Sequence, residues 1–191
     1  MAVPLVFAAP PNQVVSLKGY SVVPIKNGVT SFNFGLRGGA SGSRPGYIVS
    51  AERENFNAHG FDLTSFYAFE TDDNKNKLGA VPLFDKDEES FQVTRSGGAD
   101  CVLHDFRLLE TTQGKPTLLI VANRDSGHSF VDEETVTFNY YQLKENAAAE
   151  VGRPYLYFER VANRKTTKKY CDVGRAFLAE LGLGLYQDTQ Q

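Results

Sequence analysis

The chain of 191 residues contains no Trp, only one Met, two Cys and three His. We expect no metal and no cofactor, because no expected helix carries two His at the spacing of a zinc site. The sequence also lacks a Walker A loop, a Gly-x-Gly-x-x-Gly loop, a Gly-x-Ser-x-Gly turn, and the Ser-x-x-Lys and Lys-Thr-Gly motifs. Common nucleotide-binding and hydrolytic chemistries therefore have no motif here, and we expect a protein that is not an enzyme.

The chain has little net charge, since 20 Lys and Arg stand against 23 Asp and Glu. The two signs are interspersed and offer no broad basic surface for phosphates, so we expect no nucleic-acid partner. The cationic stretch Arg160–Lys169 is predicted to be a solvated loop. No apolar run reaches the length that a bilayer span needs, so we also expect no membrane span.

Residues 1–12 are apolar and rich in Ala and Pro. An apolar run that ends in small residues resembles the end of a secretory signal, although this run is short and carries no basic residue before it. The segment is interpreted either as a signal remnant, which implies export, or as an apolar arm. The remaining residues, 13–191, are predicted to form a single β-rich domain.

Alternating apolar and polar residues predict many short strands in that domain. The expected strands are Val14–Leu17, Gly28–Phe34, Tyr47–Ala51, Leu63–Phe69, Ala80–Phe84, Ser90–Thr94, Val102–Leu109, Thr117–Ala122, Thr135–Leu143 and Tyr155–Val161, with a glycine-rich loop over Gly35–Gly46.

Only the C-terminal part of the domain predicts a helix, over about 172–182. Asp172 is its expected N-cap and Gly182 its expected end. Its expected apolar face consists of Val173, Phe177, Leu178 and Leu181. We therefore expect a mainly β, antiparallel β-sandwich-like domain with a short C-terminal helix.

The domain contains an internal repeat, which makes a duplicated β-unit part of the expected fold. Ile48–Glu54 followed by His59-Gly60-Phe61 matches Leu119–Asp125 followed by His128-Ser129-Phe130. A β-rich run follows each His-x-Phe. The repeat halves are placed at about 28–95 and 100–161.

The repeated charged turn is the candidate ligand-binding site. Each copy carries an Arg, an adjacent acid and a His, and these groups together suit an anionic ligand. The residues concerned are Arg53, Glu54, His59, Arg124, Asp125 and His128. The alternative is that each Arg is clamped by its neighbouring acid and only fixes the turn.

Two other segments carry groups that occur in functional sites. Asp85–Glu89 is rich in carboxylates, but it lacks the ligand spacing of an EF-hand loop and is interpreted as a hydrated hairpin tip. Ser96 lies in a glycine-containing loop with no base nearby in sequence, so the glycines are interpreted as permitting a tight turn before Cys101.

Cys101 and Cys171 form either a disulfide or two buried thiols, because neither belongs to a metal-binding pattern. Each lies beside an Asp in a polar context, which together with the hint of export favours the disulfide. The bridge would tie the Gly97-Gly98 loop to the start of the C-terminal helix and predicts a Cα separation of about 4.4 to 6.8 Å.

Several segments, taken in order, resemble one known family. They are Arg53–Phe61, Val81–Asp85, Ser96–Cys101, Asp105–Leu109 and Phe177–Gly184. Together they resemble the CarG-type carbapenem intrinsic-resistance proteins, over most of the chain beyond its first two dozen residues. The resemblance implies a periplasmic, mainly β homodimer that protects against a carbapenem without being a β-lactamase.

Three functional hypotheses follow. The first is a non-enzymatic resistance protein that binds either the carbapenem or a protein target of it. The second is a periplasmic hydrolase of a cell-wall-type substrate that uses Glu54 and Asp125 as paired acids. The third is a plain protein-interaction module that presents aromatic side chains to a partner.

Overall fold

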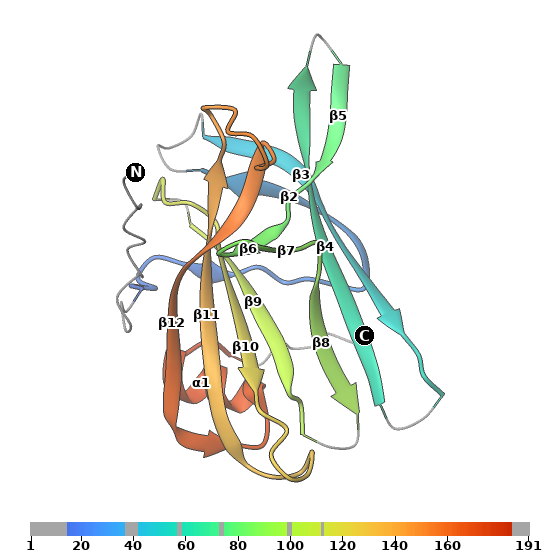
Figure 1. Ribbon diagram of the computed structural model, residues 1–191, viewed down its shortest axis with the longest axis vertical. Coiled ribbons are helices and arrows are strands. Elements are labelled where there is room, and N and C mark those ends of the chain that lie inside the picture. The colour runs from blue at the N-terminus through green and yellow to red at the C-terminus, as the bar shows by residue number, and fades with distance from the viewer. Residues whose placement is uncertain are drawn as a thin grey trace, which may run out of the picture.

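The computed structural model describes residues 15–36, 42–56, 59–72, 75–98, 101–111 and 113–184. The expected apolar arm over 1–12 lies outside these residues. Strands dominate the described chain, and one helix lies near its C-terminal end (Figure 1). The elements are β1 (Ser21–Val22), β2 (Gly28–Gly35), β3 (Ser43–Arg53), β4 (His59–Asp72), β5 (Lys75–Ala80), β6 (Leu83–Asp85), β7 (Glu88–Ser90), β8 (Val93–Gly98), β9 (His104–Glu110), β10 (Leu118–Arg124), β11 (Glu134–Glu145), β12 (Leu156–Tyr170) and α1 (Val173–Leu181).

These strands form two sheets. One has the order β1-β9-β10-β11-β12-β6-β7, and the other has the order β2-β3-β4-β5, with β8 also paired to β4. Among the pairs of described strands, only β6 and β12 run parallel. The mainly β, antiparallel sandwich-like class with a short C-terminal helix is therefore confirmed.

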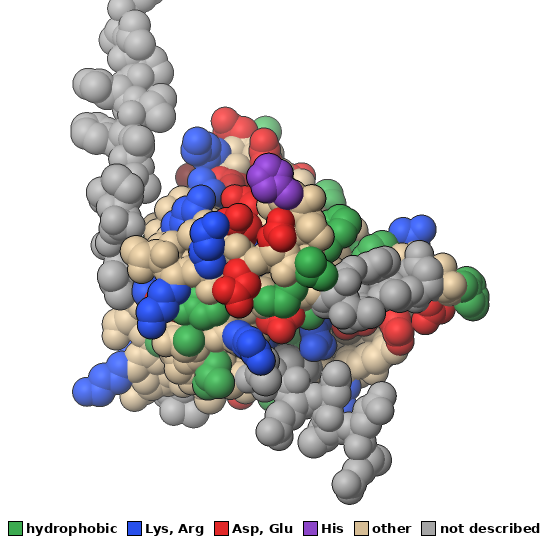
Figure 2. Space-filling model, turned by 90° about the horizontal axis from the view of Figure 1, so that it is seen from below, with side chains coloured by type: hydrophobic (Ala, Val, Ile, Leu, Met, Phe, Trp, Pro, Cys, Tyr) green, Lys and Arg blue, Asp and Glu red, His purple; other side chains and the backbone are tan. Residues whose placement is uncertain are grey.

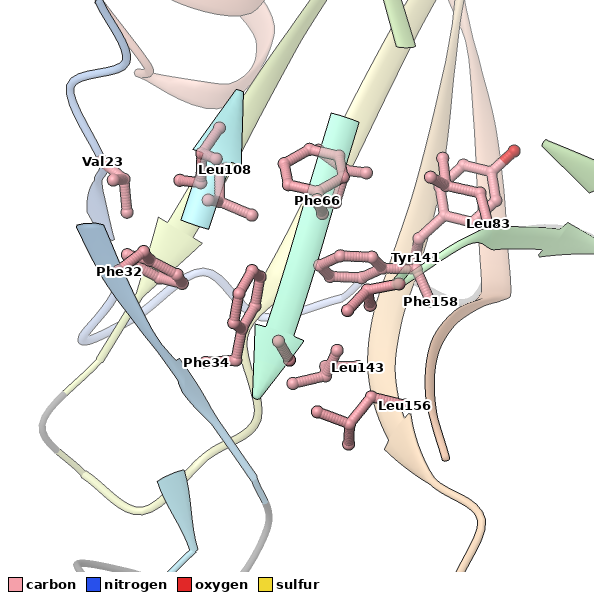
Figure 3. Close-up of a cluster of buried hydrophobic side chains, with 14 of the residues drawn as sticks. Val23, Phe32, Phe34, Phe66, Leu83, Leu108, Tyr141, Leu143, Leu156 and Phe158 are labelled. Atoms are coloured by element: carbon pink, nitrogen blue, oxygen red, sulfur yellow. The ribbon is translucent and has the colours of Figure 1, made fainter. Parts of the chain in front are cut away.

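The main hydrophobic core lies between the two sheets (Figure 3). Phe34 from β2 and Phe66 from β4 face Leu108, Tyr141 and Phe158 from the other sheet. The rings of Phe66 and Phe158 meet edge to face with centroids 5.4 Å apart, a geometry that adds to the free energy of apolar burial. This core holds the two sheets together.

A second core covers the outer face of the seven-stranded sheet. Leu118 and Ile120 of β10 pack toward α1, whereas Leu119 between them belongs to the main core. The ring of Phe177 on α1 lies 5.2 Å from that of Phe138 on β11. Because the sheet is covered on both faces, β10 is apolar almost throughout instead of alternating.

The internal repeat corresponds to two hairpins, one in each sheet. The first copy is β3–β4 and the second is β10–β11. The loops of both hairpins lie at the lower end of the molecule in Figure 1. The repeat halves do not coincide with the two sheets, because β6 and β7 from the first half join the seven-stranded sheet.

Three of the expected strands are wrong or interrupted, and one of them, Ser90–Thr94, spans the break between β7 and β8. The described part of the first, 15–17, is not a strand, and it precedes a turn at Gly19, whose φ is +82°. Its Val15 and Leu17 instead pack against the second core. The expected strand over Ala80–Phe84 is interrupted at Pro82, which has no N–H to donate to a ladder. β5 ends before it and β6 begins after it.

The glycine-rich stretch Gly35–Gly46 is not a loop over its whole length. β2 continues to Gly35 and β3 begins at Ser43, while residues 37–41 lie outside the described residues. Gly46 pairs with Ala68 inside the sheet. A Cβ at position 46 would collide with the carbonyl oxygen of Tyr67, so glycine is required there by close packing of the backbone.

The cationic stretch Arg160–Lys169 is a strand and not a loop, since β12 continues to Tyr170. It pairs with β11 across a register shift between Thr135 and Thr137. The buried Thr166 fills this irregularity, where its Oγ1 accepts a hydrogen bond from the backbone N–H of Val136 at 3.0 Å. A polar side chain satisfies the backbone that the bulge would otherwise leave unpaired.

The helix α1 ends as expected at Gly182, whose φ of +67° is the left-handed conformation of a helix C-terminus. Its N-terminal end differs from the expectation, because the Asp172 side chain makes no capping hydrogen bond. Leu178, expected on the apolar face, is 53% exposed. Gly174 and Ala176 lie on the buried face instead.

Candidate functional site: a cleft between the two sheets

A cleft of about 810 Å³ opens between the two sheets. Its walls come from β4 and β8 on one side and from β9, β10 and β11 on the other, and the β6–β7 hairpin forms one edge. It continues the main core, since Val121 packs against that core and also lines the cleft. A volume of this size is typical of small-molecule sites.

The cleft walls are largely apolar. The apolar and aromatic lining residues are Phe61, Leu83, Val93, Leu103, Val121, Phe130 and Tyr141. Phe61 and Phe130 occupy equivalent positions in the two copies of His-x-Phe. The internal repeat therefore brings its two aromatic residues to one cleft from two different hairpins.

His104 and Asn123 supply a polar pair on the same wall. They are direct neighbours on β9 and β10, and His104 Nδ1 lies 2.9 Å from Asn123 Oδ1. Because an amide oxygen only accepts hydrogen bonds, this contact is a hydrogen bond when the His104 ring carries a proton on Nδ1. The pair gives the apolar cleft a group that can orient a polar ligand.

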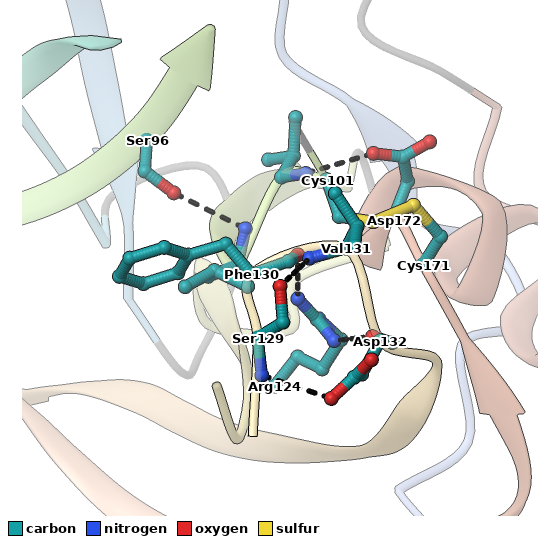
Figure 4. The surroundings of a disulfide bond; sticks show 11 residues. Ser96, Cys101, Arg124, Ser129, Phe130, Val131, Asp132, Cys171 and Asp172 are labelled. Carbon is teal, nitrogen blue, oxygen red and sulfur yellow. Dashed lines mark hydrogen bonds between the residues drawn. A yellow bond between two sulfur atoms is a disulfide. The ribbon is translucent and has the colours of Figure 1, made fainter. Parts of the chain in front are cut away.

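Ser96 joins β8 to the start of β9 at the cleft wall (Figure 4). Its Oγ accepts hydrogen bonds from the backbone N–H groups of Leu103 at 3.1 Å and His104 at 3.2 Å. The structure places no hydrogen bond between this hydroxyl and the His104 ring among the described residues. Ser96 thus holds the two sheets together at this point through backbone contacts.

Carboxylates lie along the β6–β7 edge of the cleft. They are Asp85, Glu88 and Glu89. Arg160 binds Asp85 at 2.6 Å. Burial raises the pKa of Tyr141, which lines the cleft from β11, and the negative charges of Asp85 and Glu88 raise it further while Arg160 opposes them. Asp85 and Glu88 thus act on a side chain of the cleft wall.

A disulfide fixes the β8–β9 side of the cleft. Cys101 and Cys171 are bonded with their Cα atoms 5.1 Å apart, within the range expected from the sequence. The Asp172 side chain, expected to cap α1, instead accepts a hydrogen bond from the backbone N–H of Val102 at 2.8 Å (Figure 4). Because Cys101 also lines the cleft, both contacts tie the cleft wall to α1.

In the second repeat, the charged residues expected to bind a ligand do not line the cleft. Arg124 is 2% exposed, and its Nη2 donates to the carbonyl oxygen of Phe130 at 2.7 Å. The Asp125 side chain is 82% exposed and lies 4.0 Å from Lys165 Nζ. His128 is exposed, and its backbone N–H donates to Asp132. Arg124 therefore fixes its own loop, as the alternative interpretation proposed, although through carbonyl groups and not through its neighbouring acid.

The first repeat has a comparable arrangement. The guanidinium of Arg53 lies 5.3 Å from the centre of the Phe61 ring, and Glu54 Oε1 accepts a hydrogen bond from the backbone N–H of Phe56 at 2.7 Å. The His59 side chain lies outside the described part of the structure, and its backbone pairs with Gly98. In both copies the Arg contacts the Phe that lines the cleft.

Sequence reasoning missed most residues of the cleft. The repeated Phe of His-x-Phe was the available signal for Phe61 and Phe130. No pattern linked His104 to Asn123, because their proximity comes from pairing between separate strands. Among the described residues, no group of His, Cys, Asp and Glu could hold a metal ion. No helix found there is long and apolar enough to cross a bilayer.

Comparison with known proteins identifies the fold. No family model matches the sequence, and no curated protein matches it either. The crystal structure of CarG is similar, with a TM-score of 0.64 over 83% of this chain and 94% of that chain, at 20% sequence identity. The protein therefore has a CarG-like fold.

Proposed function

We propose that the protein is a non-enzymatic carbapenem intrinsic-resistance protein that acts by binding the antibiotic or a protein target of it. The cleft carries the binding part of this proposal, because its size and its apolar walls with a few polar groups suit a small molecule. The resistance part is supported by the fold shared with CarG and by the sequence resemblance. On this proposal the protein works in the periplasm as a homodimer.

The contacts of Ser96 support binding without hydrolysis. A nucleophilic serine needs a base within hydrogen-bond reach of its hydroxyl. The Ser96 hydroxyl instead accepts two backbone hydrogen bonds, from Leu103 and His104. The His104 ring is directed through Nδ1 to Asn123.

A hydrolase with paired acids has less support. Neither Glu54 nor Asp125 lines the cleft. Glu54 binds the backbone of its own hairpin loop, and Asp125 is largely solvated. These contacts suit turn stabilisation better than proton transfer to a bound sugar.

A protein-interaction module is the second candidate, and one observation favours it. Phe56, in the β3–β4 loop, is 95% exposed and has a positive φ of 56°. Among the described residues of the lower end, however, hydrophobic, acidic and basic side chains are mixed (Figure 2). If this end binds a partner protein, a Phe56→Ser variant should bind that partner more weakly than the wild type does.

Two measurements with a carbapenem test the proposal: calorimetric titration detects binding, and the absorbance of the β-lactam ring system over time detects hydrolysis. We expect binding without loss of this absorbance. Turnover of the ring would overturn the non-enzymatic mechanism. If purified antibiotic does not bind, growth of a carbapenem-sensitive strain with and without the exported protein tests binding to a target, and equal growth in both cultures contradicts resistance altogether.

The proposed homodimer requires a separate measurement. Light scattering at several protein concentrations should give the mass of two chains. A mass of 21.1 kDa at every concentration would contradict the dimer but would leave binding in the cleft intact.

A further inference from the structure

Negatively charged side chains lie along one edge of the cleft. Among its described lining residues none is Lys or Arg, whereas the β6–β7 hairpin contributes three carboxylates. Asp85 and Glu88 are directly opposite each other on β6 and β7, so their side chains share one face of the hairpin. Arg160 forms an ion pair with Asp85, and Arg153 donates to the carbonyl oxygen of Lys86 in the same hairpin, whereas Glu88 has no ion pair among the described residues. This face therefore keeps an excess of negative charge beside the cleft.

Aromatic residues lie in the same cleft as this charge. Phe61, Phe130 and Tyr141 contribute to its walls, and the pKa of Tyr141 already responds to Asp85 and Glu88. An apolar wall alone would accept many small molecules. Aromatic rings combined with the carboxylates of Glu88 and Glu89, for which the described residues show no ion pair, favour a positively charged nitrogen attached to an apolar body, because ring faces and carboxylates both attract a cation.

We propose that the cleft selects organic ammonium ions, with the apolar body against Phe61 and Phe130 and the charged nitrogen at the Asp85–Glu88 face. The proposal rests on the cleft being the binding site of the proposed function. The proposal narrows the class of ligand. A carbapenem with a protonated amine on its side chain fits this charge distribution. A carbapenem without a basic group carries only its negative carboxylate and does not fit it. His104 and Asn123 remain available to hydrogen-bond the polar part of the ligand.

Two matched pairs of probes test the proposal by calorimetry. One pair is a carbapenem with a primary amine and the same molecule N-acetylated, and the other is phenethylammonium and N-acetylphenethylamine. N-acetylation removes the charge and keeps the rest of each molecule. We expect each amine to bind about tenfold more tightly than its acetylated form. Added salt should reduce this preference.

Glu88→Gln should lower the preference for the amine by about threefold. Glu150→Gln is the control, since Glu150 is exposed on the β11–β12 turn and does not line the cleft. Glu88 is exposed on a short strand, and therefore the variant is expected to fold. The two probe pairs, measured on the wild-type protein, test the preference for an amine without any variant.

The outcomes separate this inference from the proposed function. If both carbapenem forms bind equally, selection for ammonium is wrong while antibiotic binding stands. If phenethylammonium binds more tightly than its acetylated form and neither carbapenem binds, the inference stands and direct antibiotic binding is wrong. If no probe binds, or if Glu150→Gln acts as strongly as Glu88→Gln, the inference is overturned.

Discussion

Arg124 donates a hydrogen bond from Nη2 to the carbonyl oxygen of Phe130 at 2.7 Å, and its Nη1 donates to the carbonyl oxygen of Asp132. A buried cation therefore holds the loop that brings Phe130 to the cleft. We expect Arg124→Ala to lower the free energy of unfolding by about 3 kcal/mol, because two carbonyl groups lose a charged donor. Chemical denaturation measures this loss.

Arg53→Ala is the matched control for Arg124→Ala, since Arg53 is the equivalent residue of the first repeat. Arg53 is exposed and lies over the Phe61 ring at 5.3 Å. An exposed cation over a ring contributes up to about 1 kcal/mol. Equal losses in the two variants would contradict the loop-holding role of Arg124.

Phe130 and Phe91 provide a second matched test, because they are 54% and 56% exposed but only Phe130 lines the cleft. We expect Phe130→Ala to weaken binding of an amine-bearing carbapenem by about tenfold, since an aromatic wall is lost. Phe91→Ala should leave the affinity unchanged. A similar loss of affinity in both variants would show that the cleft is not the binding site.

The sequence predicted the fold class well because the relevant signal is local. Alternation of apolar residues and the positions of glycines depend on near neighbours, and they located most strands and the end of α1 at Gly182. The errors come from tertiary contacts. The charged stretch Arg160–Lys169 is a strand because it pairs with β11, across a bulge where Thr166 binds the backbone of Val136. Asp172 binds Val102 beside the disulfide instead of capping its helix.

The candidate site was less predictable than the fold, for the same physical reason. The repeat drew attention to Arg53 and Arg124, whose charges suggested a ligand. In the structure Arg124 binds the backbone of its own loop, and Phe61 and Phe130 line the cleft. The pair of His104 and Asn123 depends on the register of β9 against β10, which a single sequence does not reveal.

Removing the disulfide should destabilise the protein and loosen the cleft wall. The bridge joins residues separated by 70 positions, and a loop of that length predicts a loss of about 4 kcal/mol in the free energy of unfolding. Cys101→Ala combined with Cys171→Ala tests this by denaturant titration, with Asp172→Ala as the comparison. Asp172→Ala removes only the hydrogen bond to Val102, so about 1 to 3 kcal/mol is expected. A double variant as stable as the wild type would contradict a structural role for the bridge.

Acid should remove a contact between the two sheets. Arg44 on β3 binds Glu145 at the end of β11 at 3.1 Å, and the Tyr155 hydroxyl donates to the same carboxylate. The Tyr155 hydrogen bond lowers the pKa of Glu145 below its usual 4.5, and Arg44 adds to this while burial opposes it. A carboxyl whose pKa is lower in the folded state stabilises the protein above its unfolded pKa, and this contribution is lost as the pH falls through the folded value.

We therefore expect the stability difference between the wild type and Glu145→Gln to shrink between about pH 6 and about pH 3. In denaturant titrations across this range, Glu150→Gln serves as the control for removing one exposed acid. If the Glu145→Gln difference stays constant or widens toward acid, the carboxylate is not held by Tyr155 and Arg44, and the hydrogen bonds between Gly35 and Thr117 are left as a polar link between the two sheets.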